Sequence, residues 1–384
     1  MQRRAVPAVL AAAALLLAAG CSSDDGAPPE KDAAASSAAP APSSPSGKAE
    51  ETPPAKGSVS VVRTVATGLD SPWGLAPVGD GDLLVSSRDE ATITRIDGET
   101  GKKTELGEVP GVAAEGEGGL LGITLSPDFA SDHMIYAYFT SASDNRIVRM
   151  LYNERKPAGE QLGAPDTVFR GIPKGVVHNG GRIAFGPDRM LYAGTGETGD
   201  TGLAQDKKSL GGKILRLTPD GEPAPGNPFP GSPVYSYGHR NVQGLAWDGR
   251  QRLFASEFGQ NTWDELNAVA PGDNYGWPEA EGHADEGGFH NPIAQWSTAD
   301  ASPSGIAYAE GSVWMAGLRG ERLWRIPLKG TEASAKPQAF LEEYGRLRTV
   351  VAAGGDRLWL VTSNTDGRGD PKPEDDRVLE LKVS

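Results

Sequence analysis

The stretch Leu191-Tyr192-Ala193-Gly194, followed after a polar loop by Ile214-Leu215-Arg216-Leu217, shows the pattern that decides the fold. Each run is short, rich in apolar residues and bounded by glycine or polar residues, which is typical of β-strands. Similar pairs of runs recur at Leu83–Ile96, Met134–Leu151, Met190–Leu217, Leu253–Val269, Val313–Ile326 and Leu358–Leu381. Their spacing of about 45 to 63 residues, with no long helical period between them, predicts a repeat of small sheets.

The predicted fold is therefore all-β: a six-bladed β-propeller with four-stranded antiparallel blades over residues 58–384. The missing strands fall between the units, with 72–76 and 305–308 as two candidates. A strand at 58–63 and the last strand at 377–381 are expected to pair within one blade and close the ring. The alternative is a β-sandwich or two smaller β domains, whose turn signals repeat about every 8–12 residues.

The first 21 residues predict an export signal. Arg3 and Arg4 precede an apolar run of Ala and Leu, and Leu17-Ala18-Ala19-Gly20-Cys21 resembles a bacterial lipobox. Cys21 is the only cysteine, so no internal disulfide is expected, and lipid attachment there is favoured over plain secretion. We expect an exported lipoprotein of the cell membrane that faces outside the cytoplasm.

Residues 22–57 contain no Val, Ile, Leu, Met, Phe, Trp or Tyr, and this composition predicts a disordered tether. The chain has 37 Lys and Arg against 51 Asp and Glu, a net charge of −14. This acidic balance argues against nucleic acid as a partner and against electrostatic docking to anionic lipid. Membrane attachment is therefore expected only through the anchor at Cys21.

A histidine and a carboxylate flank the third unit and are candidates for acid–base chemistry. His178 lies in a glycine-rich turn, and Glu197 follows the strand at 191–194. A tight hairpin would place Glu197 beside His178, where it would fix the imidazole tautomer and raise its basicity. The alternative is a histidine in a surface turn with an unrelated glutamate.

Cationic and amide side chains occur in other loops. Arg240, Asn241 and Gln243 lie between glycines, where Arg240 could bind an anion or stack on a ring. The alternative is a structural arginine that ties blades together. Arg346 and Arg348 face the same way in extended chain, and two converging guanidinium groups suit carboxylates or phosphates. The alternative for this pair is a solvated strand face with Glu342 and Glu343 as partners. Arg319 adds a cation at the end of another strand.

The stretch 259–266 is polar and acidic, with closely spaced oxygen donors. Such loops can bind a hard cation such as Ca²⁺, although the spacing is not that of an EF-hand, and a plain polar surface loop is the alternative. Histidines are few and scattered and no second thiol exists, so a zinc site is not expected.

These residues resemble the glucose/sorbosone dehydrogenase family, whose members are quinoprotein sugar dehydrogenases built on six-bladed propellers. The resemblance rests on SPWGLAP from residue 71, GGLLGITLSPDF from 118, HNGGRIAFGPD from 178, GHRNVQGLAW from 238, SEFGQNTWDELN from 256, NYGWP from 274, SPSGIAY from 302 and RLR from 346. It implies oxidation of an aldose at its anomeric carbon to a lactone, with hydride transfer to pyrroloquinoline quinone (PQQ). The electron acceptor that reoxidises the quinone is not implied.

The resemblance also implies catalytic roles. His178 matches the base that removes the proton of the anomeric hydroxyl, and Glu197 matches the carboxylate that orients this histidine. Arg240 and Asn241 match residues beside the reactive quinone carbonyl, and Gln243 lies in the same loop.

Cofactor and metal contacts are implied as well. Arg346 and Arg348 match the pair that binds the carboxylates of the quinone. The carbonyls of Gly259 and Gln260 match those that bind Ca²⁺, which polarises the quinone carbonyl that accepts hydride.

Three positions depart from the family pattern. Arg319 stands where a cofactor-binding lysine is usual, Glu117 where a sugar-contacting glutamine is usual, and Gln260 replaces a proline. Two other functions stay open at this point. One is a non-redox propeller lipoprotein that binds sugar or another protein, and the other is a Ca²⁺-dependent lactonase-like hydrolase, against which the arginine pair argues.

Overall fold

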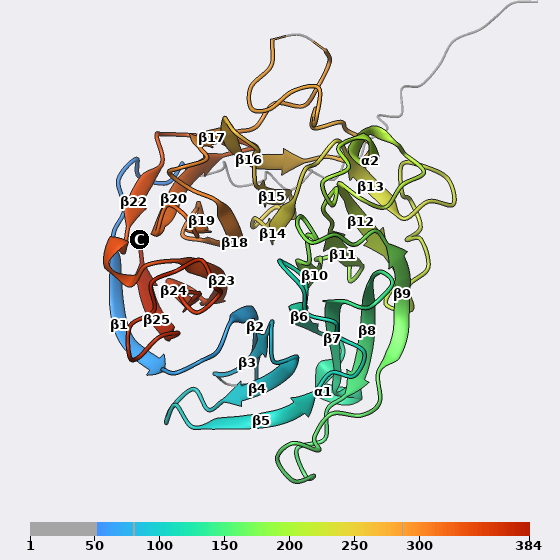
Figure 1. The fold of residues 1–384 in the computed structure, drawn as a ribbon. Coiled ribbons are helices and arrows are strands. Elements are labelled where there is room, and N and C mark those ends of the chain that lie inside the picture. The colour runs from blue at the N-terminus through green and yellow to red at the C-terminus, as the bar shows by residue number, and fades with distance from the viewer. Residues whose placement is uncertain (1–51, 80, 286) are drawn as a thin grey trace, which may run out of the picture. The chain divides into compact units, whose positions relative to one another are not determined.

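The computed structural model describes residues 52–79, 81–285 and 287–384, which fold into six antiparallel sheets arranged around a central axis (Figure 1). The predicted export signal, Cys21 and most of the predicted tether lie outside these residues. In the described part of the chain, no helix is both long enough and apolar enough to cross a bilayer.

Each sheet is one blade, and its strands follow one another outward from the axis. The first blade consists of β2 (Pro72–Val78), β3 (Asp82–Ser87), β4 (Thr92–Ile96) and β5 (Lys103–Glu108). The second consists of β6 (Leu120–Leu125), β7 (Met134–Thr140), β8 (Asn145–Leu151) and β9 (Asp166–Ile172). The third consists of β10 (Ile183–Phe185), β11 (Leu191–Gly194), β12 (Lys213–Leu217) and β13 (Val234–Tyr237).

The fourth blade consists of β14 (Val242–Trp247), β15 (Leu253–Glu257), β16 (Trp263–Val269) and β17 (Ala294–Ser297). The fifth consists of β18 (Pro303–Ala309), β19 (Ser312–Gly317), β20 (Arg322–Lys329), β21 (Glu332–Ala333) and β22 (Gln338–Phe340). The sixth consists, from the axis outward, of β23 (Leu347–Gly354), β24 (Arg357–Thr362), β25 (Val378–Val383) and β1 (Val59–Ala66). Short helical turns are α1 (Phe129–Asp132), α2 (Gly202–Gln205) and η1 (Glu342–Tyr344). The predicted six-bladed propeller is confirmed.

The repeat visible in the sequence is the middle of each blade. Its six units coincide with β3–β4, β7–β8, β11–β12, β15–β16, β19–β20 and β24–β25. Both candidate inner strands are also confirmed, because 72–76 lies in β2 and 305–308 in β18. The fifth blade differs from the others, since β20 pairs with both β21 and β22.

The ring is closed by a blade that contains strands from both ends of the described chain. β1 pairs antiparallel with β25, with Val59 opposite Val383 and Thr64 opposite Leu379. Early and late strands therefore share a blade, as predicted. Residues just before β1 also contact the fifth blade. Arg325 donates to the Pro54 carbonyl at 3.0 Å, and the Gly57 N–H donates to Gln338 at 2.9 Å. These contacts place residues 54–57 with the propeller, whereas the sequence assigned them to the tether.

The hydrophobic core lies between neighbouring blades. One cluster joins Leu84 and Ile93 of the first blade to Ile123 and Ile135 of the second. Another closes the ring, because it joins Leu75 and Leu83 of the first blade to Val361, Val378 and Val65 of the last. Side chains on the two faces of each sheet thus pack against the adjacent sheets, which explains why the strands read as short apolar runs.

The closing strand generates a stability prediction. Val65 of β1 is buried, at 6% exposure, whereas Val62 of the same strand is 45% exposed. We expect Val65→Ala to lower the free energy of unfolding by about 2 kcal/mol, because it leaves a cavity at the ring closure. The matched change Val62→Ala is expected to alter it by less than about 0.5 kcal/mol. Chemical denaturation measures both, and equal effects would show that β1 does not pack as described.

Candidate active site

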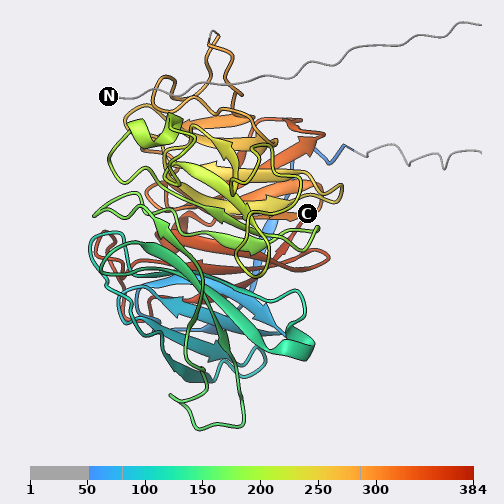
Figure 2. The same ribbon diagram turned by 90° about the vertical axis from the view of Figure 1, so that its right-hand side faces the viewer.

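The predicted site residues gather at one end of the propeller. Neighbouring strands are antiparallel, so in every blade the innermost strand, here called the first, starts at the same face of the ring at which the second strand ends. Figure 1 views the ring along its axis, with β2, β6, β10, β14, β18 and β23 innermost, and Figure 2 shows it from the side. Residues before first strands and after second strands therefore surround one opening of the channel.

His178 and Glu197 form a close pair. Nδ1 of His178 lies 2.6 Å from Oε1 of Glu197, and the Glu197 side chain is only 1% exposed. The β10–β11 hairpin returns the chain as predicted, with Ile183 opposite Ala193. Gly196 is required beside the pair, because a Cβ there would overlap the His178 carbonyl. The surface-turn interpretation with an unrelated glutamate does not fit this geometry.

Arg240 determines the tautomer of His178. Its Nη2 lies 3.0 Å from Nε2 of His178. A guanidinium can only donate, so Nε2 must accept and carries no proton. The proton of the neutral ring therefore sits on Nδ1 and is donated to Glu197. Such a ring presents a basic lone pair on Nε2, as a general base requires.

Arg240 is itself held in place by its own blade. Its N–H donates to Oε2 of Glu257 at 2.8 Å, and Nη1 donates to the Phe258 carbonyl at 3.2 Å. Burial lowers the pKa of Arg240, although nearby carboxylates such as Glu197 oppose this effect. Arg240 thus ties loops together, as the structural interpretation expected, and also contacts the histidine, whereas anion binding by this residue stays a prediction.

Glu117 contacts the histidine through the main chain. Its Oε2 accepts the N–H of His178 at 2.9 Å, and its Oε1 pairs with Arg368 at 2.9 Å. Glu117 therefore lies next to the candidate base, where the sequence predicted a substrate contact. Arg368, on the loop after β24, did not stand out in the sequence.

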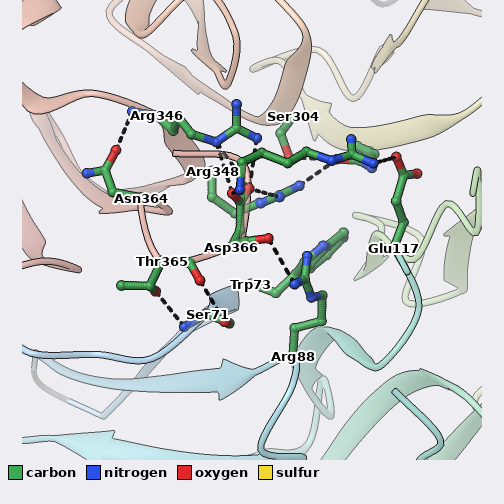
Figure 3. A network of polar contacts seen from close by, with 12 residues as sticks. Ser71, Trp73, Arg88, Glu117, Ser304, Arg346, Arg348, Asn364, Thr365 and Asp366 are labelled. Carbon is green, nitrogen blue, oxygen red and sulfur yellow. Dashed lines mark hydrogen bonds and ion pairs between the residues drawn. The ribbon is translucent and has the colours of Figure 1, made fainter. Parts of the chain in front are cut away.

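Arg346 and Arg348 converge as predicted, but on a residue of the protein itself. Nη2 of Arg346 lies 2.8 Å from Oδ2 of Asp366, and Nη2 of Arg348 lies 3.2 Å from the same oxygen (Figure 3). Both arginines are buried. Glu342 and Glu343 are not their partners, so the interpretation as a solvated strand face is wrong.

The electrostatics of this cluster favour an anion. Burial lowers the pKa of Arg348 to about 10, even though Asp366 opposes the shift. Burial acts to raise the pKa of Asp366, but hydrogen bonds and charge from Arg346 and Arg348 keep it below its ordinary value. One carboxylate therefore balances two buried cations, and an additional anionic ligand would complete the balance.

The amides Asn241 and Gln243 line the same region. Oε1 of Gln243 accepts from Arg348 at 3.0 Å and from Ser304 at 3.1 Å. Asn241 accepts the Gly180 N–H at 2.9 Å. Several buried side-chain donors in the described residues have no partner, and three of them belong to predicted site residues, namely Asn241 Nδ2, Arg240 Nε and Arg348 Nε. Buried donors without partners are costly, so these atoms are suited to a ligand rich in acceptor oxygens.

A cavity of about 370 Å³ lies against this cluster. It is lined by Trp73, Arg88, Glu117, Gln243, Phe258, Ser302, Leu318, Arg319, Arg346, Arg348, Asp366 and Arg368. The exposed side chain of Arg319 thus reaches the same space as the buried pair. A cavity of this volume is typical of a small-molecule site. A larger cavity of about 750 Å³ contains none of the predicted site residues.

Gly259 and Gln260 lie in the loop between β15 and β16, next to Phe258 at the cavity. In the described part of the chain, no hydrogen bond ends on either carbonyl oxygen. The same part contains no cluster of three or more His, Cys, Asp or Glu side chains that could bind a metal. A cation at this end would therefore need carbonyl ligands, and these two carbonyls fit that requirement.

Sequence reasoning missed several residues of the site. Asp366 and Arg88 were not identified, although both follow the second strand of a blade, as Glu197 and Arg319 do. Aligning the six units on that position would have found them. Trp73 was seen only as part of a strand. The centroid of its ring lies 4.4 Å from Cζ of Arg182 and 5.7 Å from Cζ of Arg348, so two guanidinium groups lie over it.

Comparisons with known proteins identify relatives of this chain. The family model "Glucose / Sorbosone dehydrogenase" matches residues 69–369. The chain is 84% identical to an aldose sugar dehydrogenase from Streptomyces coelicolor solved in its PQQ-bound form, with a TM-score of 0.86, covering 86% of this chain and 100% of that chain. A putative oxidoreductase (glucose dehydrogenase) from Thermus thermophilus is 42% identical, with a TM-score of 0.75, covering 85% of this chain and 100% of that chain.

Among curated proteins, quinoprotein glucose dehydrogenase B from Acinetobacter calcoaceticus is 30% identical over 284 residues. That match covers 65% of this chain and 59% of the relative, so the chain spans less than two thirds of its length. The family model, by contrast, spans most of the propeller, including every predicted catalytic, cofactor, substrate and metal residue. The chain therefore belongs to the glucose/sorbosone dehydrogenase family.

Proposed function

We propose that this chain is a PQQ-dependent aldose dehydrogenase that oxidises the anomeric carbon of a sugar to a lactone. The observation that carries the proposal is that the His178–Glu197 pair is bonded to Glu117, which lines the same cavity as the buried arginine pair. The pair suits proton removal, and the cluster suits an anionic cofactor. The PQQ-bound relative from Streptomyces coelicolor supports the choice of cofactor.

His178 would act as the general base. The anomeric hydroxyl of a bound aldose would replace Arg240 as the donor to Nε2 and pass its proton to that atom. Glu197, which accepts from Nδ1, would stabilise the resulting imidazolium. Loss of this proton lets the anomeric carbon release its hydrogen as hydride, which leaves the lactone carbonyl.

The cationic cluster would bind the quinone. Arg346, Arg348 and Arg319 would contact its carboxylates, and the unpaired donors of Asn241 and Arg240 would face its other oxygens. When bound, PQQ supplies the two-electron acceptor for the hydride. Ca²⁺ on the carbonyls of Gly259 and Gln260 would supply a Lewis acid beside it. Glu117, beside the base, would contact the sugar.

We also propose that the protein is exported and held at the membrane by lipid on Cys21. The apolar leader and the sequence ending in Cys21 support this. The protein is expected in the membrane fraction, and Cys21→Ser, which removes the lipid attachment atom, is expected to move it to the soluble fraction. Immunoblotting of the two fractions measures the distribution, and a variant that stayed membrane-bound would contradict the anchor.

Reconstitution tests the proposed activity. Adding PQQ and Ca²⁺ to the cofactor-free protein is expected to produce aldose-dependent reduction of a dye, measured by absorbance. Protein that binds no quinone under these conditions would contradict the proposal. A non-redox sugar-binding propeller would show no effect of the quinone.

Arg319→Gln is the variant that reports on the cofactor site, because its exposed side chain can be changed with little effect on folding. We expect it to weaken PQQ binding about tenfold through loss of a charge-assisted contact. Arg155→Gln removes an exposed arginine outside this cavity and is the matched control. Equal quinone affinities in both variants would show that Arg319 does not contact the cofactor.

His178→Ala tests the role of the base. We expect turnover to fall by about 100- to 10,000-fold, because the proton acceptor is lost, while PQQ affinity stays within a few-fold. Steady-state kinetics and quinone titration give the two values, with a change of the exposed His283 to Ala as control. A parallel loss of quinone binding would indicate that His178 has a structural role instead.

A further inference from the structure

The loop between β15 and β16 is hydrogen-bonded to a carboxylate that lies about 20 residues further along the chain. Oε1 of Glu281 accepts hydrogen bonds from four successive backbone N–H groups, those of Gln260 at 2.6 Å, Asn261 at 2.9 Å, Thr262 at 3.0 Å and Trp263 at 3.2 Å. Consecutive N–H groups that point at one anion form a nest. The loop therefore owes its conformation to Glu281.

This bonding sets the direction of two carbonyl groups. The peptide bonds of this loop are trans, so the C=O and N–H of each peptide unit point in opposite directions. The N–H of Gln260 shares its peptide unit with the carbonyl of Gly259, and the N–H of Asn261 shares its unit with the carbonyl of Gln260. Because both N–H groups point toward Glu281, both carbonyls point away from it.

The peptide unit between Phe258 and Gly259 comes directly before these two units and contacts the candidate active site. The N–H of Gly259 donates to Oδ1 of Asp264 at 2.9 Å, and the carbonyl of Phe258 in the same unit accepts from Arg240 at 3.2 Å. Phe258 lines the cavity of the candidate active site. The loop thus begins with a carbonyl bonded to Arg240 of the candidate site, and its next two N–H groups are bonded to Asp264 and Glu281.

Gly259 lets the carboxylate approach closely. A Cβ at this position would meet Oε1 of Glu281 at 2.7 Å and would overlap the carbonyl of Trp263. Burial acts to raise the pKa of Glu281, but the four N–H bonds outweigh it and hold the pKa below its ordinary value. Four hydrogen bonds to one oxygen thus hold the carboxylate against the loop.

We propose that Glu281 is a positioning residue that presents the carbonyls of Gly259 and Gln260 to the active-site divalent cation. The inference rests on the proposed function and adds to it a residue that does not touch the cation. The carboxylate fixes the orientation of both peptide units before the cation binds. Its hydrogen bonds also polarise those units, which makes the carbonyl oxygens better ligands.

The experiment compares four variants of the full chain. Glu281→Ala removes the acceptor, Glu281→Gln keeps a neutral acceptor, and Glu281→Asp keeps the charge but shortens its reach. Glu279→Ala removes an exposed carboxylate two residues away and controls for net charge. Calcium is titrated into chelator-treated protein with saturating PQQ, and the quinone absorbance gives the affinity. Hydrogen exchange of the amides of 260–263 is measured without calcium, and thermal unfolding confirms that each variant folds.

We expect Glu281→Ala and Glu281→Asp to lower calcium affinity by about tenfold or more, with Glu281→Gln between them and wild type. Amide protection at 260–263 should fall in the same order, and Glu279→Ala should match wild type in both measurements. Wild-type affinity in Glu281→Ala would overturn the inference. Wild-type affinity in Glu281→Asp with low affinity in Glu281→Ala would also overturn it, because charge alone would then be responsible. Failure of the wild type to bind quinone at all would instead contradict the proposed function, and the inference with it.

Discussion

Four buried guanidinium groups at one end of the channel impose the constraint on which the candidate site depends. Arg182, Arg240, Arg346 and Arg348 are each less than 10% exposed, in a protein whose net charge is −14. Charges removed from water must be paired or hydrogen-bonded. Asp366 serves two of them, and Arg182 bonds to the Gln243 carbonyl at 2.8 Å and to Thr349 at 2.8 Å. Within this cluster the positive charge left unbalanced favours an anionic ligand.

The same arrangement couples the cationic cluster to the candidate base. Arg240 donates to His178, Glu117 accepts from the main chain of His178, and Gln243 accepts from Arg348. The residues in these contacts lie in or next to strands of four different blades. Arg240 and Gln243 are three residues apart, so one short segment contacts both the histidine and Arg348.

The sequence predicted the architecture because each blade repeats a local pattern. Pairs of short apolar runs at regular spacing identified β3–β4 and its five counterparts, and terminal strand patterns identified the pairing of β1 with β25. The extra pairing of β20 with β22 and the contacts of Pro54 with Arg325 could not be read in this way. They depend on tertiary contacts between segments that carry no periodic signal of their own.

The site was predictable where residue type and spacing were informative, and not elsewhere. His178 with Glu197, and Arg346 with Arg348, were found because local geometry brings each pair together. Asp366 lies in a loop of Asn, Asp and Gly residues that looks like an ordinary turn, and Glu281 bonds to a loop about 20 residues away. The resemblance to the family supplied roles for loop residues, Glu197 included, but not for Asp366, which bonds to the arginine pair, or for Glu281, which bonds to the loop after β15.

The central claim is that the channel end is an anion site built for a quinone. Isothermal titration of the cofactor-free protein with PQQ in the presence of Ca²⁺ tests it most directly. The account predicts saturable binding of one quinone per chain that weakens as salt is raised, because the contacts are ionic. Absence of binding, or binding that does not respond to salt, would contradict it.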